Sequence, residues 1–179
     1  MKAVVVAIIS LTVGLSVGSI FYYHAPFYTP AKKAVALINP TKGNSVDGVV
    51  TFTKESRGIR IVADIHNLTP GEHGFHIHEW GACNCDDAVC AGDHFNPTHT
   101  RHGARENKER HVGDLGNIKA DELGNARLDV IDTVITLNGP QSIIGRSVII
   151  HEKADDGKTQ PTGNAGKRVA CGVVGIARS

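Results

Sequence analysis

The sequence predicts an all-β domain, an eight-stranded sandwich or barrel, on three observations. Short runs rich in β-branched residues recur along residues 31–179, and turn residues separate them, in a chain with 20 glycines. Apolar and polar residues alternate in several of these runs, as they do in a strand with one buried face. Nothing in this part of the chain needs a long helix. Residues 31–179 are therefore predicted to form one β domain behind a leader, residues 1–30.

The leader is predicted from its lack of charge. Residues 3–23 follow Lys2 and carry no charge, and no charged residue appears again until Lys32. This pattern is typical of a signal peptide or of an N-terminal membrane anchor. The apolar run is long for a signal peptide, which favours an anchor, whereas the segment 16–18 offers small residues for cleavage. Both interpretations predict export: a secreted, periplasmic or membrane-attached domain that faces an oxidising compartment.

The strands are predicted in chain order from the alternation. Seven segments carry the β pattern: 32–39, 46–53, 58–66, 73–80, 115–132, 142–152 and 169–177. Turn residues at 39–44 and 67–71 separate the early segments, and Glu122–Asn125 makes 115–132 a hairpin. The total is about eight strands. Asn67 also begins an N-x-T sequon, which matters only in a host that glycosylates proteins.

Residues 73–114 concentrate the side chains that can bind metals. They hold seven of the ten histidines and three of the four cysteines, and Asp114 follows the last of these histidines by three places. Neutral imidazole is the commonest nitrogen ligand for zinc and copper. His76 and His78 lie two apart in a predicted strand, so both rings can reach one ion. His73 has the opposite parity, and we expect it to be structural, with its ring nitrogens bonded to the backbone.

A polar connection of about thirty residues follows Trp80. Loops longer than roughly 12–15 residues are uncommon in compact domains unless they are functional or disordered. Metal binding can order such a loop. The candidate ligands inside it are His94, His102, His111 and Asp114, and His151 would reach the site from a later strand. The alternative is a disordered insert that happens to carry histidines. The cysteines between Trp80 and His94 do not have the spacing of a zinc knuckle.

Charge and cysteine content limit the alternatives. The net charge is +1 without a basic stripe, so the sequence gives no indication of nucleic-acid binding. Four cysteines in an oxidising compartment allow two disulfides in three connectivities. Cys171 stands alone near the C-terminus and needs one of Cys83, Cys85 or Cys90 as its partner.

Five separated motifs resemble the copper/zinc superoxide dismutase family, and they occur in the family's order: HGFHIHEWG, AGDHFNP, RHVGDLGNI, IIGRSVIIHEKADD and TGNAGKRVACGVVGIA. The resemblance covers residues 31–179. It implies an eight-stranded, immunoglobulin-like Greek-key sandwich or flattened barrel with a long metal-binding loop and a short electrostatic-type loop; the family is a known example of the sandwich architecture. It also implies an enzyme that converts two superoxide anions to oxygen and hydrogen peroxide by one-electron cycling of a histidine-bound copper beside a structural zinc.

The resemblance implies a role for each site residue, with one copper and one zinc per chain. The copper ligands would be His76, His78, His94 and His151, and the zinc ligands would be His94, His102, His111 and Asp114. Four nitrogens suit copper(II), and three imidazoles with a carboxylate suit zinc. His94 would bridge the two ions and help supply a proton for peroxide. Asp155 would bond to one ligand of each ion, His76 and His102; Arg168 would dock the anion beside copper; and Thr162 would line the channel opposite.

The chain departs from the eukaryotic members of this family in two loops. Lys158 is the only charge between Asp156 and Thr162, so we expect little electrostatic steering from this loop and a copper more open to larger anions. Ala88 stands where those members carry a disulfide cysteine. Cys83 instead matches the Gly-x-Cys placement of bacterial periplasmic members, so we expect the bridge Cys83–Cys171 and a second, local bridge Cys85–Cys90. The alternative is a bridge from Cys171 to Cys85 or to Cys90.

The resemblance also bears on partners and on alternative functions. Apolar residues keep the positions of a dimer interface found in many family members, so we expect a homodimer: Trp80-Gly81, Ile144-Gly145 and Ile176. The alternative function is a non-catalytic copper/zinc-binding or copper-delivery protein on the same fold, or a zinc-stabilised adhesion module. Copper-delivery relatives tend to lose copper ligands, whereas this chain keeps all four.

Overall fold

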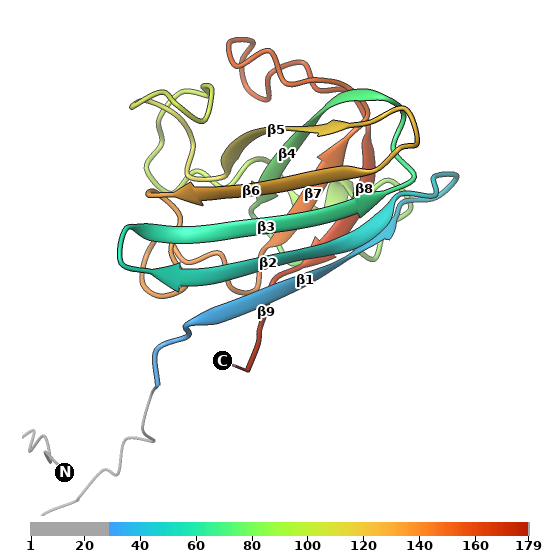
Figure 1. Cartoon of the computed structure of the whole chain (residues 1–179). Helices are drawn as coiled ribbons and strands as arrows, with labels where there is room; N and C mark the ends of the chain where they lie inside the picture. Colours follow the sequence, from blue (N-terminus) through green and yellow to red (C-terminus); the bar gives the residue numbers. More distant parts are fainter. Residues whose placement is uncertain (1–28, 179) are drawn as a thin grey trace, which may run out of the picture.

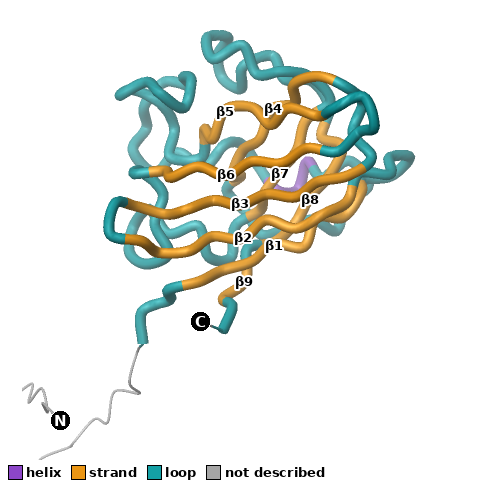
Figure 2. The backbone as a smooth tube through the Cα atoms, in the orientation of Figure 1, coloured by secondary structure: helices purple, strands orange, loops and turns teal. Residues whose placement is uncertain are grey.

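The computed structural model describes residues 29–178, and within them it contains a closed β-barrel (Figures 1 and 2). Its strands are β1 (Lys33–Pro40), β2 (Asp47–Glu55), β3 (Gly58–His66), β4 (Gly71–His78), β5 (Asp114–Ala120), β6 (Ala126–Asp132), β7 (Ser147–His151), β8 (Arg168–Val173) and β9 (Gly175–Ile176). The sheet order is β2-β3-β6-β5-β4-β7-β8-β1-β9, and β1 also pairs with β2. Strands β1 to β8 therefore close on themselves, and the all-β, eight-stranded prediction is confirmed; β9 is a two-residue addition on β1.

The barrel is flattened because two of its seams are narrow. β5 and β6 pair only through Ala120 and Ala126, and β1 and β8 pair only at the C-terminal end of β1. By contrast, β2 and β3 pair along their whole lengths. Two layers, β1-β2-β3-β6 and β5-β4-β7-β8, thus lie face to face. β3 pairs with β6 while the chain continues to β4, and this crossing makes the Greek-key arrangement.

The core lies between the two layers. In β3 the buried side chains alternate with exposed or half-buried ones, and the buried set is Ile59, Ile61, Ala63 and Ile65. Burying an isoleucine side chain contributes about 1.5–3 kcal/mol. β4 and β7 differ, since β7 is buried at every position and β4 at six of its eight. These two strands therefore present side chains both to the core and to the covered outer face, where the site lies.

Two of the predicted strands are shorter than expected. The segment 142–152 becomes a strand only at Ser147, because a turn with Gly145 at φ 78° precedes it. Ile143 is fully buried from this turn, and its apolar character was the reason for the longer prediction. The segment 169–177 is divided into β8 and β9 at Val174, whose N–H bonds to a loop carbonyl.

The predicted leader falls almost entirely outside the described residues, and so does the candidate membrane attachment at 3–23. Between residues 29 and 178 no helix has the length and apolar character that a bilayer-spanning segment needs. The 3-10 helix η1 (Val89–Ala91) is the only helix in that part of the chain.

Candidate metal centre

Two groups of metal-ligating side chains lie together on the covered face of β4 and β7. They are His76, His78, His94 and His151 in one group, and His94, His102, His111 and Asp114 in the other. In each group the candidate ligand atoms lie within 4.8 Å of one another, and all seven residues are buried. The structure thus brings together every ligand that the resemblance implied, and His94 belongs to both groups.

β4 and β7 position the four-histidine group. His76 and His78 lie on one face of β4, as their spacing predicted, and β7 pairs beside them and ends in His151. The Nε2 atoms of His78 and His151 are 3.4 Å apart. His73 lies elsewhere: its Nδ1 is 2.8 Å from the carbonyl oxygen of His151 and its Nε2 is 2.8 Å from that of Thr69. These contacts are the backbone bonds expected for a structural histidine.

The long loop, residues 79–113, is attached to β4 by its own backbone. Phe95 N–H donates to the Ile77 carbonyl at 2.8 Å, and Ile77 N–H donates to the Gly113 carbonyl at 2.9 Å. Gly113 N–H donates in turn to the Phe95 carbonyl at 2.9 Å. The two ends of the loop therefore meet over the middle of β4, and this meeting places His94 between its two sets of neighbours.

Asp114 is the centre of the second group. Its carboxylate oxygens lie 2.7 Å from Nδ1 of His94, 3.0 Å from Nδ1 of His102 and 3.2 Å from Nδ1 of His111. Burial alone would raise the pKa of Asp114, but the three imidazoles outweigh it and hold the pKa far below its usual range. Burial likewise opposes protonation of His102, yet Asp114 and Asp155 raise its pKa to about 9. The carboxylate is therefore charged and available as a ligand.

Burial favours the neutral form of three histidines in the other group, His78, His94 and His151. It lowers the pKa of His78 and of His151 well below the usual histidine value, and neighbouring positive charge adds to the effect. Burial also lowers the pKa of His94 to about 4, because the bond to Asp114 only partly offsets it. Neutral imidazoles carry the lone pair that a metal ion needs.

Four of the six rings also have a buried nitrogen that forms no hydrogen bond. They are His76 Nδ1 and His94 Nε2, together with His102 Nδ1 and His111 Nδ1, which face the Asp114 carboxylate without hydrogen-bond geometry. The opposite nitrogens of His76 and His102 are bonded to Asp155 and that of His94 to Asp114. In the four-histidine group, His78 Nδ1 is likewise occupied by the Gly92 carbonyl at 2.9 Å. A buried polar atom without a partner costs about 1–3 kcal/mol. Bound ions would remove this cost, so the donor sets fit a copper in the four-histidine group and a zinc in the group around Asp114.

Asp155 connects the two groups, because its carboxylate contacts one histidine of each. Its Oδ2 lies 2.8 Å from His76 Nε2 and its Oδ1 lies 2.9 Å from His102 Nε2, and these are the two contacts that the resemblance implied. Burial opposes ionisation, but the two imidazoles and the Gly157 N–H hold the pKa of Asp155 below its usual range. The carboxylate thereby orients one ligand of each group, which is the usual arrangement behind metal-binding histidines.

Arg168 begins β8 directly opposite His151. Its Nη1 donates to the Ala88 carbonyl and its Nη2 to the Gly92 carbonyl, both at 2.7 Å. The same Gly92 carbonyl is bonded to His78 Nδ1 at 2.9 Å, so the guanidinium lies near the four-histidine group, and its charge contributes to the lowered pKa values of His78 and His151. Thr162 is half-buried in the loop between β7 and β8.

Two amide side chains support the site and were missed from the sequence. Asn117 on β5 accepts from Asp155 N–H at 2.7 Å and donates to the Asp155 carbonyl at 2.9 Å. Gln160 pairs in the same way with the backbone of His102, at 2.9 Å in both directions. Asparagine and glutamine are common in loops and strand ends, so neither residue carried a signal of its own.

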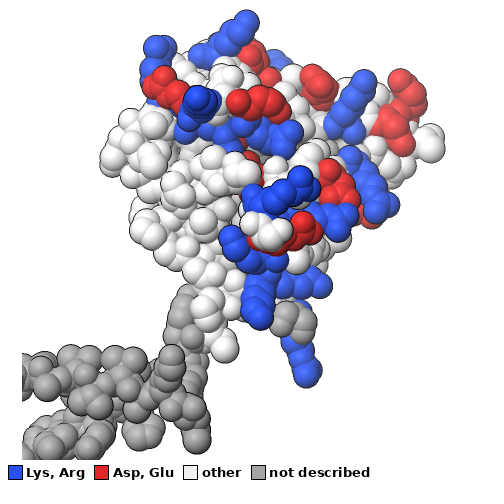
Figure 3. Space-filling view, turned by 60° about the vertical axis from the view of Figure 1, so that its left-hand side comes forward, with Lys and Arg blue, Asp and Glu red and all other residues white. Residues whose placement is uncertain are grey.

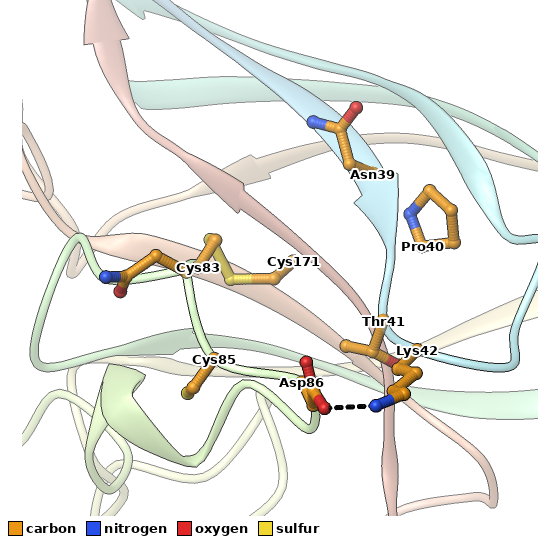
Figure 4. Close-up of a pocket in the computed structure, with 9 residues that line it drawn as sticks. Asn39, Pro40, Thr41, Lys42, Cys83, Cys85, Asp86 and Cys171 are labelled. Atoms are coloured by element: carbon orange, nitrogen blue, oxygen red, sulfur yellow. Dashed lines mark hydrogen bonds and ion pairs between the residues drawn. A yellow bond between two sulfur atoms is a disulfide. The ribbon is translucent and has the colours of Figure 1, made fainter.

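The two disulfides are those that the resemblance implied. Cys83 bonds to Cys171 and thereby joins the long loop to β8, and Cys85 bonds to Cys90 within the loop. Figure 4 shows the first bridge on the wall of a surface pocket, with the Lys42–Asp86 ion pair beside it.

Comparison with known proteins gives concordant results. Residues 46–174 match the family model described as copper/zinc superoxide dismutase (SODC). The chain is 44% identical over 146 residues to a superoxide dismutase [Cu-Zn] of Onchocerca volvulus, an alignment that covers 75% of this chain and 92% of the relative. It is 43% identical over 157 residues to an extracellular superoxide dismutase [Cu-Zn] of Brugia pahangi, covering 83% and 78%. Among solved structures it resembles the clock protein EA4, with a TM-score of 0.78, 44% identity, and 84% and 98% of the two chains covered.

Proposed function

This chain belongs to the copper/zinc superoxide dismutase family, and we propose that its four-histidine group holds the copper and its Asp114 group the zinc. The enzyme converts two superoxide anions and two protons to oxygen and hydrogen peroxide. Copper, when bound, supplies the one-electron chemistry, and zinc holds the loop. The observation that carries the assignment is that two buried donor sets share His94.

His94 connects the two sets through different atoms of one ring. Its Nδ1 lies 2.7 Å from Asp114 Oδ1, whereas its Nε2 has no hydrogen-bond partner. The ring centroid lies 4.1 Å from that of His76 and 4.9 Å from that of His78, so it packs against the copper set. Nε2 is the atom that we expect to hold a proton and to give it to the second superoxide as peroxide forms.

Arg168 supplies the positive charge for the anion. An arginine has five N–H donors, and two carbonyls hold the guanidinium here, so further donors remain for superoxide. A guanidinium keeps its charge at every physiological pH. Charge in a cleft raises association rates by roughly 10- to 1000-fold, an effect for which this family is itself a known example. Thr162 is proposed to line the opposite side of the channel.

The first test combines turnover with metal content. Residues 31–179 loaded with copper and zinc are expected to accelerate superoxide decay in proportion to bound copper, measured by pulse radiolysis. One copper and one zinc per chain without turnover would overturn the catalytic assignment. It would leave a metal carrier on a dismutase fold.

The second test concerns Arg168. We expect Arg168→Ala to slow turnover about tenfold or more at low salt and to flatten its dependence on ionic strength. Lys158→Ala is the matched control, since Lys158 is the only charge between Asp156 and Thr162 and we expect little steering from it. Full turnover of Arg168→Ala at low salt would contradict the docking role.

A homodimer is the proposed assembly. Trp80 is 62% exposed and Ile176 is 68% exposed. Gly81, next to Trp80, lies so near Gly145 and Val173 that an added Cβ atom would meet both. Exposed apolar residues that gather on one surface mark interfaces. Ile176→Glu is expected to shift sedimentation from dimer to monomer, whereas Leu123→Glu, at an 84% exposed position in the β5–β6 turn, is the control that keeps the dimer. An unchanged dimer in Ile176→Glu would place the interface elsewhere.

Export to an oxidising compartment is the proposed location. Both disulfides of the described domain support it, and one relative is named as extracellular. In Figure 3, acidic and basic side chains are interspersed along the top and the right of the face, whereas its left part is largely uncharged. N-terminal sequencing of protein recovered from the medium and from membranes would distinguish a cleaved signal peptide from a retained anchor at residues 3–23.

A further inference from the structure

The guanidinium of Arg168 depends on one short segment of the long loop. Its two acceptors, the carbonyls of Ala88 and Gly92, stand at the two ends of η1. Both bonds are 2.7 Å long and run to nitrogens of the same planar group. The orientation of the guanidinium is therefore set by the backbone shape of residues 88–92.

That backbone shape is unfavourable by itself. Ala88 has φ 56°, in the left-handed region that a residue with a Cβ atom adopts at a cost. It lies inside the ring that the Cys85–Cys90 disulfide closes. Within the ring, Ala88 N–H donates to the Cys85 carbonyl at 3.1 Å and Cys90 N–H donates to Cys85 Sγ at 3.0 Å. The ring thus stabilises the conformation in which the Ala88 carbonyl meets Arg168.

The beginning of the ring is attached to the barrel (Figure 4). Cys83 is bonded to Cys171 on β8. Asp86 accepts from Lys42 twice, from its backbone N–H at 2.8 Å and from its ammonium group at 2.6 Å. The Cys85–Cys90 disulfide connects this attached side to the segment 88–92 that carries the two acceptors.

We propose that the Cys85–Cys90 disulfide is a positioning element for Arg168. It holds the carbonyls of Ala88 and Gly92 where they orient the guanidinium beside the four-histidine group. The inference rests on the proposed function, in which Arg168 attracts superoxide. When the disulfide is absent, Ala88 is free to return to a right-handed conformation, and the guanidinium loses a fixed acceptor.

Nuclear magnetic resonance of arginine side chains tests the positioning without any turnover. The sample is the zinc-loaded, copper-free protein, in which copper(II) cannot broaden the signals. We expect the guanidinium N–H signals of Arg168 to exchange with water about tenfold faster in C85S/C90S than in the wild type, because their acceptors become mobile. Arg146 is the internal control, since its side chain donates to the Glu79 and Ser142 carbonyls outside the ring.

A double-mutant cycle tests whether the Cys85–Cys90 disulfide affects turnover and anion binding through Arg168. C85S/C90S is expected to slow turnover per bound copper and to weaken azide binding, each by about three- to tenfold, and to have no further effect in an Arg168→Ala background. Effects that add independently in that background, or an unchanged Arg168 signal, would overturn the inference. If Arg168→Ala alone changes neither quantity, the anion role in the proposed function fails, while the resonance experiment still decides the positioning.

Zinc content shows whether the disulfide positions Arg168 alone or holds the whole loop in its folded form. C85S/C90S and a second pair, C85A/C90A, are both expected to bind one zinc per chain, as the wild type is expected to. Loss of zinc in both variants would show that the disulfide holds the whole loop and would contradict a specific role at Arg168.

Discussion

At the scale of single residues, the site depends on two buried carboxylates placed among imidazoles. A buried charge without partners is very costly, so these groups are stable only because every oxygen is paired. Asp114 is surrounded by three histidines, and Asp155 by two histidines and the Gly157 N–H. Gly163 makes room for this arrangement, since a Cβ atom at that position would lie 1.8 Å from Asp155 Oδ1.

Gly163→Ala is expected to displace the Asp155 carboxylate and to weaken zinc binding by about 10- to 100-fold, measured by competition with a chelator. Gly139→Ala is the matched control: both glycines have positive φ, 69° and 83°, but a Cβ at Gly139 meets nothing within 4 Å. The control is expected to lose about 1–2 kcal/mol of stability and no zinc affinity. Equal zinc affinity in the two variants would show that Asp155 tolerates the displacement.

At the scale of elements, a polar loop of 35 residues, 79–113, is ordered against β4 and β6. Arg110 is buried within it and donates to the carbonyls of His111, Val112 and Asp114. Its Nη2 also lies 2.5 Å from Asp132 Oδ2 at the end of β6. Buried backbone carbonyls need hydrogen-bond donors, and this one guanidinium donates to three carbonyls where the loop ends and β5 begins.

Arg110→Ala is expected to lower the free energy of unfolding by about 3–5 kcal/mol, because it leaves the Asp132 carboxylate buried without its charge partner. Urea denaturation of the zinc-loaded protein measures this loss of unfolding free energy. Arg60→Ala removes the exposed ion pair with Asp129 between β3 and β6, and we expect it to change stability little because water and salt screen that pair. A similar small effect for both variants would mean that Asp132 finds another partner.

At the scale of the whole molecule, the metal-binding histidines of the strands lie on the outer face of a closed barrel, on two neighbouring strands. β4 and β7 contribute His76, His78 and His151, and the loop then covers them. The Cys83–Cys171 disulfide crosses 88 residues of sequence and joins that cover to β8. A rigid scaffold and a fastened loop together hold the two groups of ligands side by side.

Removal of this bridge in C83S/C171S is expected to cost about 4–5 kcal/mol of unfolding free energy, from the loop entropy of the unfolded chain. The Cys85–Cys90 disulfide closes a ring of only six residues, so its removal in C85S/C90S is expected to cost about 2 kcal/mol by the same reasoning. Thermal unfolding of the two variants at equal metal content measures the difference. Equal losses would show that the unfolded chain is not the source of the stabilisation.

The sequence alone determined the strand pattern, the shared face of His76 and His78, and the ligand set through the resemblance of five motifs. These features depend on the alternation of apolar and polar residues and on residue identity, and both can be recognised in the sequence without the structure. Tertiary structure decided that Nδ1 is the free nitrogen of His76, because Asp155, 79 residues away in the sequence, occupies its Nε2. It also decided the acceptors of Arg168 and the roles of Arg110 and Asn117. Common polar residues such as arginine and asparagine have many possible partners, so only the packing of distant segments selects among them.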